Sequence, residues 1–163
     1  MLSKTIQDAI NDQIKNEYYS AYLYLSMSAY FESLNLPGSA KWMRTQHDEE
    51  MIHALKLFDY VNDRNGRVSL KAIDQPATEW ASPLAAWENV LEHERQVTAS
   101  INNLYAQAVK EGDYASQAAL AWFVTEQVEE EKNATLMVER FKMAGNQPAT
   151  LLLFDGHFTK RGE

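Results

Sequence analysis

The sequence contains no cysteine among its 163 residues. Disulfide bonds and thiolate metal sites of the zinc-finger or rubredoxin kind are therefore excluded. Any metal site in this chain must be built from Asp, Glu and His, with Tyr as a further ligand type. Such oxygen and nitrogen ligands suit hard or borderline metal ions.

Long apolar runs are also missing. No stretch approaches the roughly 20 apolar residues that a membrane-spanning helix needs, so we expect no membrane partner. The first 20 residues have neither an apolar core run nor a small-residue cleavage site. We expect them to form the first turns of an amphipathic helix rather than a signal peptide, and we expect a cytoplasmic protein.

Positive charge is in short supply, with 15 Lys and Arg against 23 Asp and Glu and a net charge of −8. This balance argues against nucleic acid as the main partner. A surplus of carboxylates suits the gathering of cations, although a solvated acidic surface is its commoner origin. With 45% hydrophobic and 23% charged residues, the composition predicts one soluble globular domain over residues 1–163.

Proline and glycine are few, at 4 and 6 residues, and they mark the breaks between stretches of helical periodicity. Ser3 and Ser82 are the expected N-caps of the first and third stretches, and Pro83 fits the first helical position. The four long predicted helices run from about Ser3 to Ser33, about Ser39 to Asn65, about Pro83 to Gly112 and about Asp113 to Ala144.

Loop lengths predict how these helices are arranged. The first and third connections have only about six and three residues, so each joins antiparallel neighbours. The middle connection, of about 16 residues, can span roughly 50 Å. A helix of about 27 residues is about 40 Å long, so this connection can run the length of the bundle and leave the second and third helices parallel. We therefore predict an all-α fold, a four-helix bundle over about 3–144 with one long crossover, and a short fifth helix over about 148–158.

Acidic residues occupy the apolar stripe of every long helix when the stripe is followed in steps of three and four residues. An ionised carboxylate in a low-dielectric core costs several kcal/mol unless it is paired or binds a metal. The stripes contain no matching supply of Lys or Arg, whereas two divalent cations would compensate about four carboxylates. For one helix alone, an acid at the edge of the bundle is an equally good interpretation. The inward acids are Glu17, Glu50, Glu94, Glu126 and Glu130.

One histidine strengthens the metal hypothesis. Glu50-Met51-Ile52-His53 is an E-x-x-H step, which places a carboxylate and an imidazole on one face of a helix. A single such step is common by chance. It supports a metal site here because Glu50 lies in the inward-facing stripe of its helix, as the acids of the other helices lie in theirs. For His47, His93 and His157 we favour an ordinary structural interpretation.

Four segments carry a resemblance to a known family. They are NEYYSAYLYLSMS around Glu17, QHDEEMIHALKLFDYV around Glu50, HERQVTASIN around Glu94, and WFVTEQVEEEK in the fourth helix. Over nearly its whole length the chain resembles the non-haem bacterial-type ferritins, whose bundles hold two irons. The resemblance implies an iron-storage shell of roughly 24 identical subunits, each with a ferroxidase centre that oxidises Fe²⁺ with O₂ or H₂O₂.

The resemblance also implies which residues bind iron. The first metal position matches Glu17, Glu50 and His53. The second matches Glu50, Glu94 and Glu130, so that Glu50 bridges the two ions.

Bacterial-type ferritins have a third, inner iron site, which matches Glu49, Glu126 and Glu129. Tyr24 lies two turns from Glu17 on the same helical face and matches the tyrosine that the family places beside the metals. Ordinary aromatic packing is the alternative interpretation of Tyr24.

One position separates this chain from the bacterioferritins. Those proteins carry a second E-x-x-H on the fourth helix, whereas this chain has Asn133 three residues after Glu130. The second metal would lack an imidazole and be held more loosely, which suits iron in transit better than a permanent cofactor. Met51 stands where bacterioferritins bind haem, but plain ferritins can carry Met there too, and we expect no haem.

Three alternatives to ferroxidase storage stay open. A di-iron oxidase or oxygenase acting on a small substrate would need an apolar pocket and usually a second His ligand. A bacterioferritin-like storage protein would bind haem. A purely structural all-α interaction protein would keep its inward acids solvated.

The last segment, TLLLFDGHF from Thr150 to Phe158, is too apolar to be left in water. A four-helix bundle leaves this segment no place in its own core, so we expect identical tails to meet around the fourfold axes that the resemblance implies. A tail folded against its own subunit is the alternative.

Overall fold

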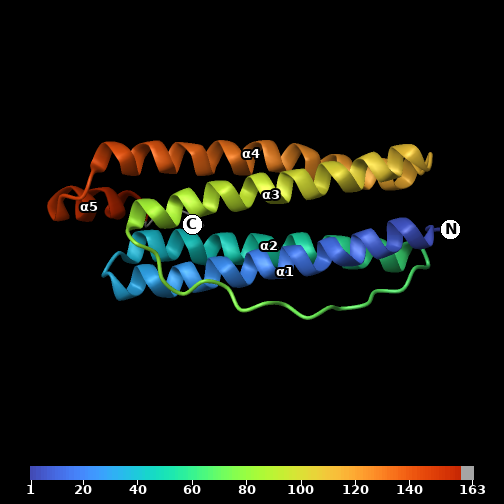
Figure 1. Cartoon of the computed structure of the whole chain (residues 1–163), viewed down its shortest axis with the longest axis horizontal. Coiled ribbons are helices and arrows are strands. Elements are labelled where there is room, and N and C mark those ends of the chain that lie inside the picture. Colours follow the sequence, from blue (N-terminus) through green and yellow to red (C-terminus); the bar gives the residue numbers. More distant parts are fainter. Residues whose placement is uncertain (159–163) are drawn as a thin grey trace.

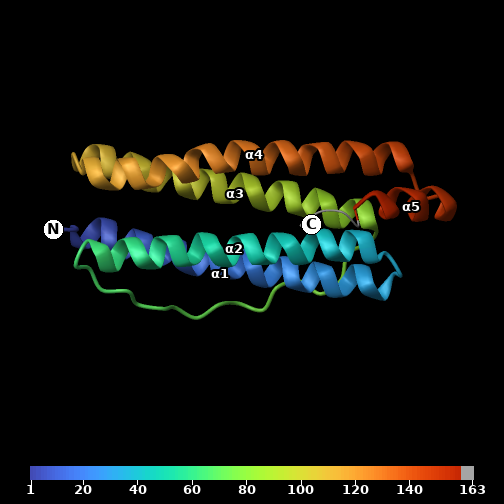
Figure 2. The same cartoon turned by 180° about the vertical axis from the view of Figure 1, so that it is seen from behind.

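The computed structural model describes residues 1–158, and within this range the chain is entirely helical apart from its connections. The elements are α1 (Lys4–Ser33), α2 (Pro37–Asp63), α3 (Pro83–Lys110), α4 (Tyr114–Ala144), α5 (Pro148–Asp155) and a 3₁₀ turn, Gly156–Phe158. α1 pairs with α2 and α3 with α4. Residues 64–82 connect α2 to α3 and run along the outer side of the α1–α2 pair, over the length of the bundle (Figures 1 and 2). The predicted bundle with one long crossover and a short fifth helix is confirmed.

Helix ends follow local chemistry. The Ser3 and Ser82 hydroxyls accept hydrogen bonds from backbone N–H groups in the first turns of α1 and α3, as predicted. α2 begins at Pro37 and not at Ser39, because proline fits the first turn of a helix. It ends at Asp63, and Asn65 beyond it has a positive φ of 55°. The other predicted ends of the four long helices agree with the structure to within about two residues. The fifth helix ends at Asp155, and a 3₁₀ turn covers the rest of its predicted range.

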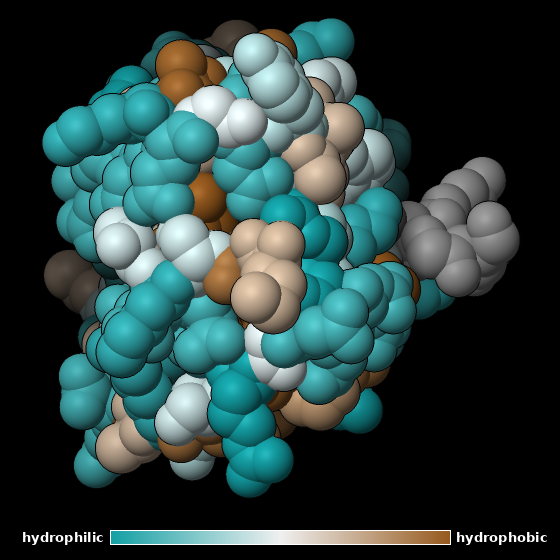
Figure 3. Space-filling model, turned by 90° about the vertical axis from the view of Figure 1, so that its right-hand side faces the viewer, coloured by the Kyte–Doolittle hydropathy of each residue, from teal (hydrophilic) through white to brown (hydrophobic). Residues whose placement is uncertain are grey.

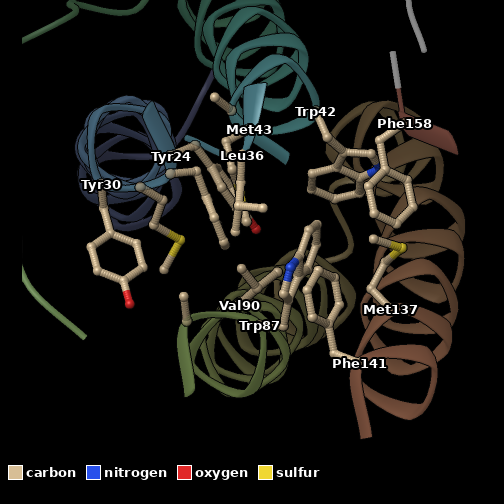
Figure 4. Packing of buried hydrophobic residues seen from close by; sticks show 14 of the residues in the cluster. Tyr24, Tyr30, Leu36, Trp42, Met43, Trp87, Val90, Met137, Phe141 and Phe158 are labelled. Carbon is tan, nitrogen blue, oxygen red and sulfur yellow. The ribbon is translucent and has the colours of Figure 1, made fainter. Parts of the chain in front are cut away.

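Two apolar clusters fill the interior, and a polar layer separates them. One cluster, at the α5 end, contains Trp42, Trp87 and Phe141, with the Trp42 and Trp87 rings 4.6 Å apart (Figure 4). The other, at the opposite end, includes Ile10 and Leu120. Along each long helix the buried acids come between residues of the two clusters, so the acids of all four helices meet at one level.

The C-terminal segment corrects one prediction. Phe158 is only 6% exposed and belongs to the apolar cluster of its own chain, stacked on Phe141 at 6.2 Å. The expectation that this segment has no place in its own core is therefore wrong. Four helices close a bundle along its sides but leave its ends open, and residues 148–158 fill one end. Leu152 and Leu153 still face outward, at 60% and 71% exposure.

The opposite end of the molecule, where α1 begins, presents mainly hydrophilic residues with scattered apolar ones (Figure 3). Within residues 1–158 no helix is both long enough and apolar enough to cross a membrane.

Candidate metal centre

The polar layer collects side chains from all four long helices. Glu17 and Tyr24 come from α1, and α2 contributes Glu50 and His53. α3 and α4 contribute one acid each, at positions 94 and 130. All six side chains are buried, so inward-pointing acids are a feature of the folded chain and not an error in helical phase.

Three of these residues form a compact group. Ligand atoms of Glu17, Glu50 and His53 all lie within 4.8 Å of one another. His53 Nδ1 is 3.1 Å from Glu50 Oε2, as the E-x-x-H spacing on one helical face predicts. An ion that contacts each ligand at about 2.0–2.2 Å could bind all three after small side-chain movements.

The other side of the layer is joined by amide and hydroxyl donors. The Gln46 side-chain amide donates to Glu50 Oε1 at 3.2 Å and to Glu130 Oε2 at 2.9 Å. The Tyr24 hydroxyl donates to Glu94. Gln46 thus joins Glu50 to Glu130, whereas Glu94 is held separately by Tyr24. The second compact ligand group consists of His53, Glu126 and Glu130. His53 therefore lies within reach of two ligand sets, whereas the sequence assigned it to one.

Burial makes these carboxyls poor acids. Removal from water, followed by repulsion from Glu50, raises the pKa of Glu17 well above its ordinary value. Removal from water also raises the pKa of Glu50 well above its ordinary value, with repulsion from Glu94 and Glu130 as the next causes. The pKa of Glu94 is raised by burial, and that of Glu130 reaches about 8 through burial and the charge of Glu94. A raised pKa favours the protonated, neutral form of a carboxyl. A cation bound in the layer would instead favour the ionised carboxylates, so its binding would release their protons.

The remaining three predicted acids lie beside the buried layer. Glu49, Glu126 and Glu129 line a cavity of about 430 Å³, and Glu130 of the layer reaches the same cavity. Glu129 is exposed, and Glu49 and Glu126 are half-buried. The placement of Glu126 within the core stripe was thus partly wrong, because the cavity opens between α2 and α4 at that level.

Two of the other three histidines have structural contacts, and the third, His157, lines the acidic cavity. His93 is buried, its Nε2 lies 2.7 Å from the Ser20 hydroxyl, and burial lowers its pKa to about 4. His47 Nδ1 lies 2.8 Å from the backbone oxygen of Ala21.

Sequence reasoning missed three buried glutamines that contact the acids. Gln13 donates to Glu17 at 2.8 Å, Gln46 donates as described above, and Gln127 donates to the Oε2 of Glu94 at 3.1 Å. Gln13 and Gln46 each precede an acid of the layer by four residues, and Gln127 precedes one by three. A glutamine one turn from a core acid was therefore a signal available in the sequence, although Gln127 contacts Glu94 of α3 and not Glu130, the acid one turn away.

Comparison with known proteins shows the family of the chain. The profile of a family described as "Ferritin-like domain" matches residues 7–144. The chain belongs to the ferritin-like family. Among relatives, this ferritin-like chain is 43% identical to a bacterial non-heme ferritin of Bacteroides fragilis, over 99% of this chain and 100% of that protein. It is 37% identical to a bacterial non-heme ferritin of Staphylococcus haemolyticus, covering 99% and 97% of the two chains.

Among solved structures, an open pore ferritin from the hyperthermophilic archaeon Archaeoglobus fulgidus is similar, with a TM-score of 0.97 and 47% identity over 99% of each chain. The resemblance of this ferritin-like chain to the non-haem bacterial-type ferritins is confirmed.

Proposed function

We propose that this protein stores iron by oxidising Fe²⁺ at the buried polar layer and depositing Fe³⁺ as mineral inside a hollow shell of identical subunits. One observation carries the proposal. Four buried carboxylates and an imidazole meet in one layer, and no Lys or Arg is buried anywhere in residues 1–158. Charges of one sign are stable in such a place only when protons or metal ions compensate them.

Two Fe²⁺ ions fit the layer as substrates. Glu17, Glu50 and His53 hold the first, and Glu50, Glu94 and Glu130 hold the second, so Glu50 bridges the two ions. Three protein ligands on each ion leave coordination positions open for an oxidant. Each Fe²⁺ loses one electron, and the pair reduces O₂ with two protons to H₂O₂, or H₂O₂ with two protons to two water molecules. The carboxylates favour the more highly charged Fe³⁺ that results.

The acidic cavity provides a route away from the layer. Its lining includes Glu49, Glu126 and Glu129. The possible ligand atoms of Glu126, His53 and Glu130 also lie within 4.8 Å of one another. These acids form the third iron site and pass the ion from the layer toward mineral. Asn133 lines the same cavity and offers no imidazole, which favours iron in transit over a resident di-iron cofactor.

Assembly into a homo-oligomer of about 24 subunits completes the proposed function. Two features support it. The exposed Leu152 and Leu153 of α5 place an apolar face at one end of the subunit. The chain also matches ferritin structures over nearly its whole length.

An anaerobic Fe²⁺ titration followed by exposure to O₂ tests the proposal. We expect rapid oxidation of about two Fe²⁺ per subunit, followed by slower mineral growth in the shell fraction. Glu50→Ala removes the bridging ligand and should abolish the rapid phase while the shell still assembles. Glu88→Ala, at an exposed position of α3, is the matched control. Oxidation at full speed in Glu50→Ala would show that the site is elsewhere.

A further inference from the structure

Gln13 is a buried glutamine of the layer, and both ends of its side-chain amide have defined partners. It is 2% exposed, and its Nε2 donates to Glu17 Oε1 at 2.8 Å, one turn along α1. Its Oε1 accepts a hydrogen bond from the Ser100 hydroxyl of α3 at 2.5 Å.

Three hydrogen bonds connect Asn16, Ser100, Gln13 and Glu17, and in each of them the earlier residue of this series is the donor. The Asn16 side-chain amide donates to Ser100 Oγ at 3.4 Å, which leaves the hydroxyl proton of Ser100 for Gln13 Oε1. With its oxygen so engaged, Gln13 must turn its NH₂ group toward Glu17. The rotamer of a carboxylate on α1 is thereby tied to α3, the helix that contributes Glu94.

This chain of bonds has a consequence for Glu17. Its Oε1 receives the Gln13 donor, whereas Oε2 receives none from Gln13 and is the oxygen that we expect to bind a cation. We propose that Gln13, held by Ser100, is a positioning residue that keeps Glu17 in one orientation and favours its binding of the first metal through Oε2. The proposal rests on the proposed function, because it assumes that Glu17 is a metal ligand.

A role in folding alone would predict something different. If Gln13 only satisfied buried polar atoms, its replacement would lower the melting temperature and leave the geometry of a bound metal unchanged. If it positions Glu17, replacement should change metal affinity and ligand geometry at the first site. Loss of a group that orients a metal ligand typically weakens metal binding by about 10–100-fold.

Co²⁺ is a suitable probe because its visible absorption reports coordination geometry and it does not react with O₂ as Fe²⁺ does. The full-length, metal-free protein is titrated with Co²⁺, with affinity, stoichiometry and spectrum recorded. We expect Gln13→Leu to weaken the first Co²⁺ position by about tenfold or more and to alter its spectrum. Ser100→Ala should have a smaller effect in the same direction, and Ser100→Thr, which keeps the hydroxyl, should restore the wild-type values.

Gln117→Leu is the matched control, because Gln117 is a half-buried glutamine on α4 that donates to the backbone oxygen of Ala108, away from the layer. Wild-type protein that binds no Co²⁺ would overturn the proposed function. Wild-type binding of about two Co²⁺ per subunit, with unchanged affinity and spectrum in Gln13→Leu, would overturn only the positioning role. If Gln13→Leu fails to fold, the two Ser100 variants test the proposal in its place. Ser100→Ala loses the hydroxyl and Ser100→Thr keeps it, so identical Co²⁺ binding in these two variants would reject the proposal.

Discussion

Glu130 holds a proton at neutral pH in the metal-free protein, because burial and the charge of Glu94 raise its pKa to about 8. The other carboxyls of the layer shift in the same direction. A cation binds the carboxylate form, so metal binding at pH 7 must release protons.

We therefore predict proton release when redox-inert Zn²⁺ binds at pH 7, and less release at pH 9, where Glu130 is already ionised. Calorimetric titration in buffers of different ionisation enthalpy measures the number of protons. Glu130→Gln should lower that number at pH 7. Equal proton release at the two pH values in the wild type would contradict the assigned protonation.

The same carboxyls make the stability of the metal-free protein depend on pH. A folded-state pKa above the ordinary value of 4.5 contributes stability that is fully present below about pH 4.5 and is lost as pH rises through about 8. His93 acts in a different window. Its folded-state pKa of about 4, below the ordinary 6.5, contributes stability that is lost as pH falls from 6.5 through 4.

Between about pH 6.5 and 8.5 the carboxyls dominate, and we predict that the melting temperature of the metal-free protein falls across this range. Glu130→Gln should flatten the curve and raise the melting temperature at pH 8.5 by several degrees, since it removes a buried charge. Scanning calorimetry with a chelator present measures both effects. A melting temperature that rises from pH 6.5 to 8.5 would be incompatible with buried, protonated acids.

At the scale of the element, α2 has an unusual N-terminal cap. Its N-cap residue, Leu36, offers no side-chain acceptor. The buried carboxylate of Asp155 serves instead, accepting from the Gly38 N–H, the Ser39 N–H and the Ser39 hydroxyl, each at 2.7 Å. A Cβ at Gly38 would lie 1.9 Å from the Asp155 backbone oxygen, so this close approach of the C-terminal segment to α2 requires glycine.

We predict that Asp155→Ala destabilises the fold by about 1–3 kcal/mol, because three donors at a buried helix end lose their acceptor. Hydrogen exchange should increase in α5 and in the first turn of α2, and Gly38→Ala should have the same effect by steric clash. Asp74→Ala, in the exposed crossover, is the control. Unchanged exchange in α5 of Asp155→Ala would show that other contacts hold this helix.

At the scale of the whole molecule, the C-terminal segment has two separable roles. Phe158 and Phe154 pack against Phe141 in the subunit's own core. Leu152 and Leu153 point away from that core. Truncation after Asn146 removes both roles together, so it should lower the melting temperature of the subunit as well as weaken the shell.

The double variant Leu152→Ser, Leu153→Ser isolates the second role. We predict that its subunits stay folded with little change in helical content, whereas the shell becomes weaker or leakier and retains less iron. Size-exclusion chromatography with light scattering, together with the iron retained after mineralisation, measures this. A double variant that forms shells as stable and as iron-retentive as the wild type would contradict a role for these leucines in assembly.

Sequence periodicity by itself determined the four long helices and the inward direction of Glu17, Glu50, Glu94 and Glu130, and the length of the crossover determined the parallel relation of α2 and α3. Residue spacing sets the face of a helix, and loop length sets the direction of the next one. Tertiary structure alone decided which donors meet which acids, such as Ser100 with Gln13, and where the C-terminal segment lies. These contacts depend on the axial offset and rotation of one helix against another, which spacing within a helix does not specify. Phe158 fills an open bundle end, and Asp155 caps a helix more than a hundred residues earlier in the chain, because packing brought those surfaces together.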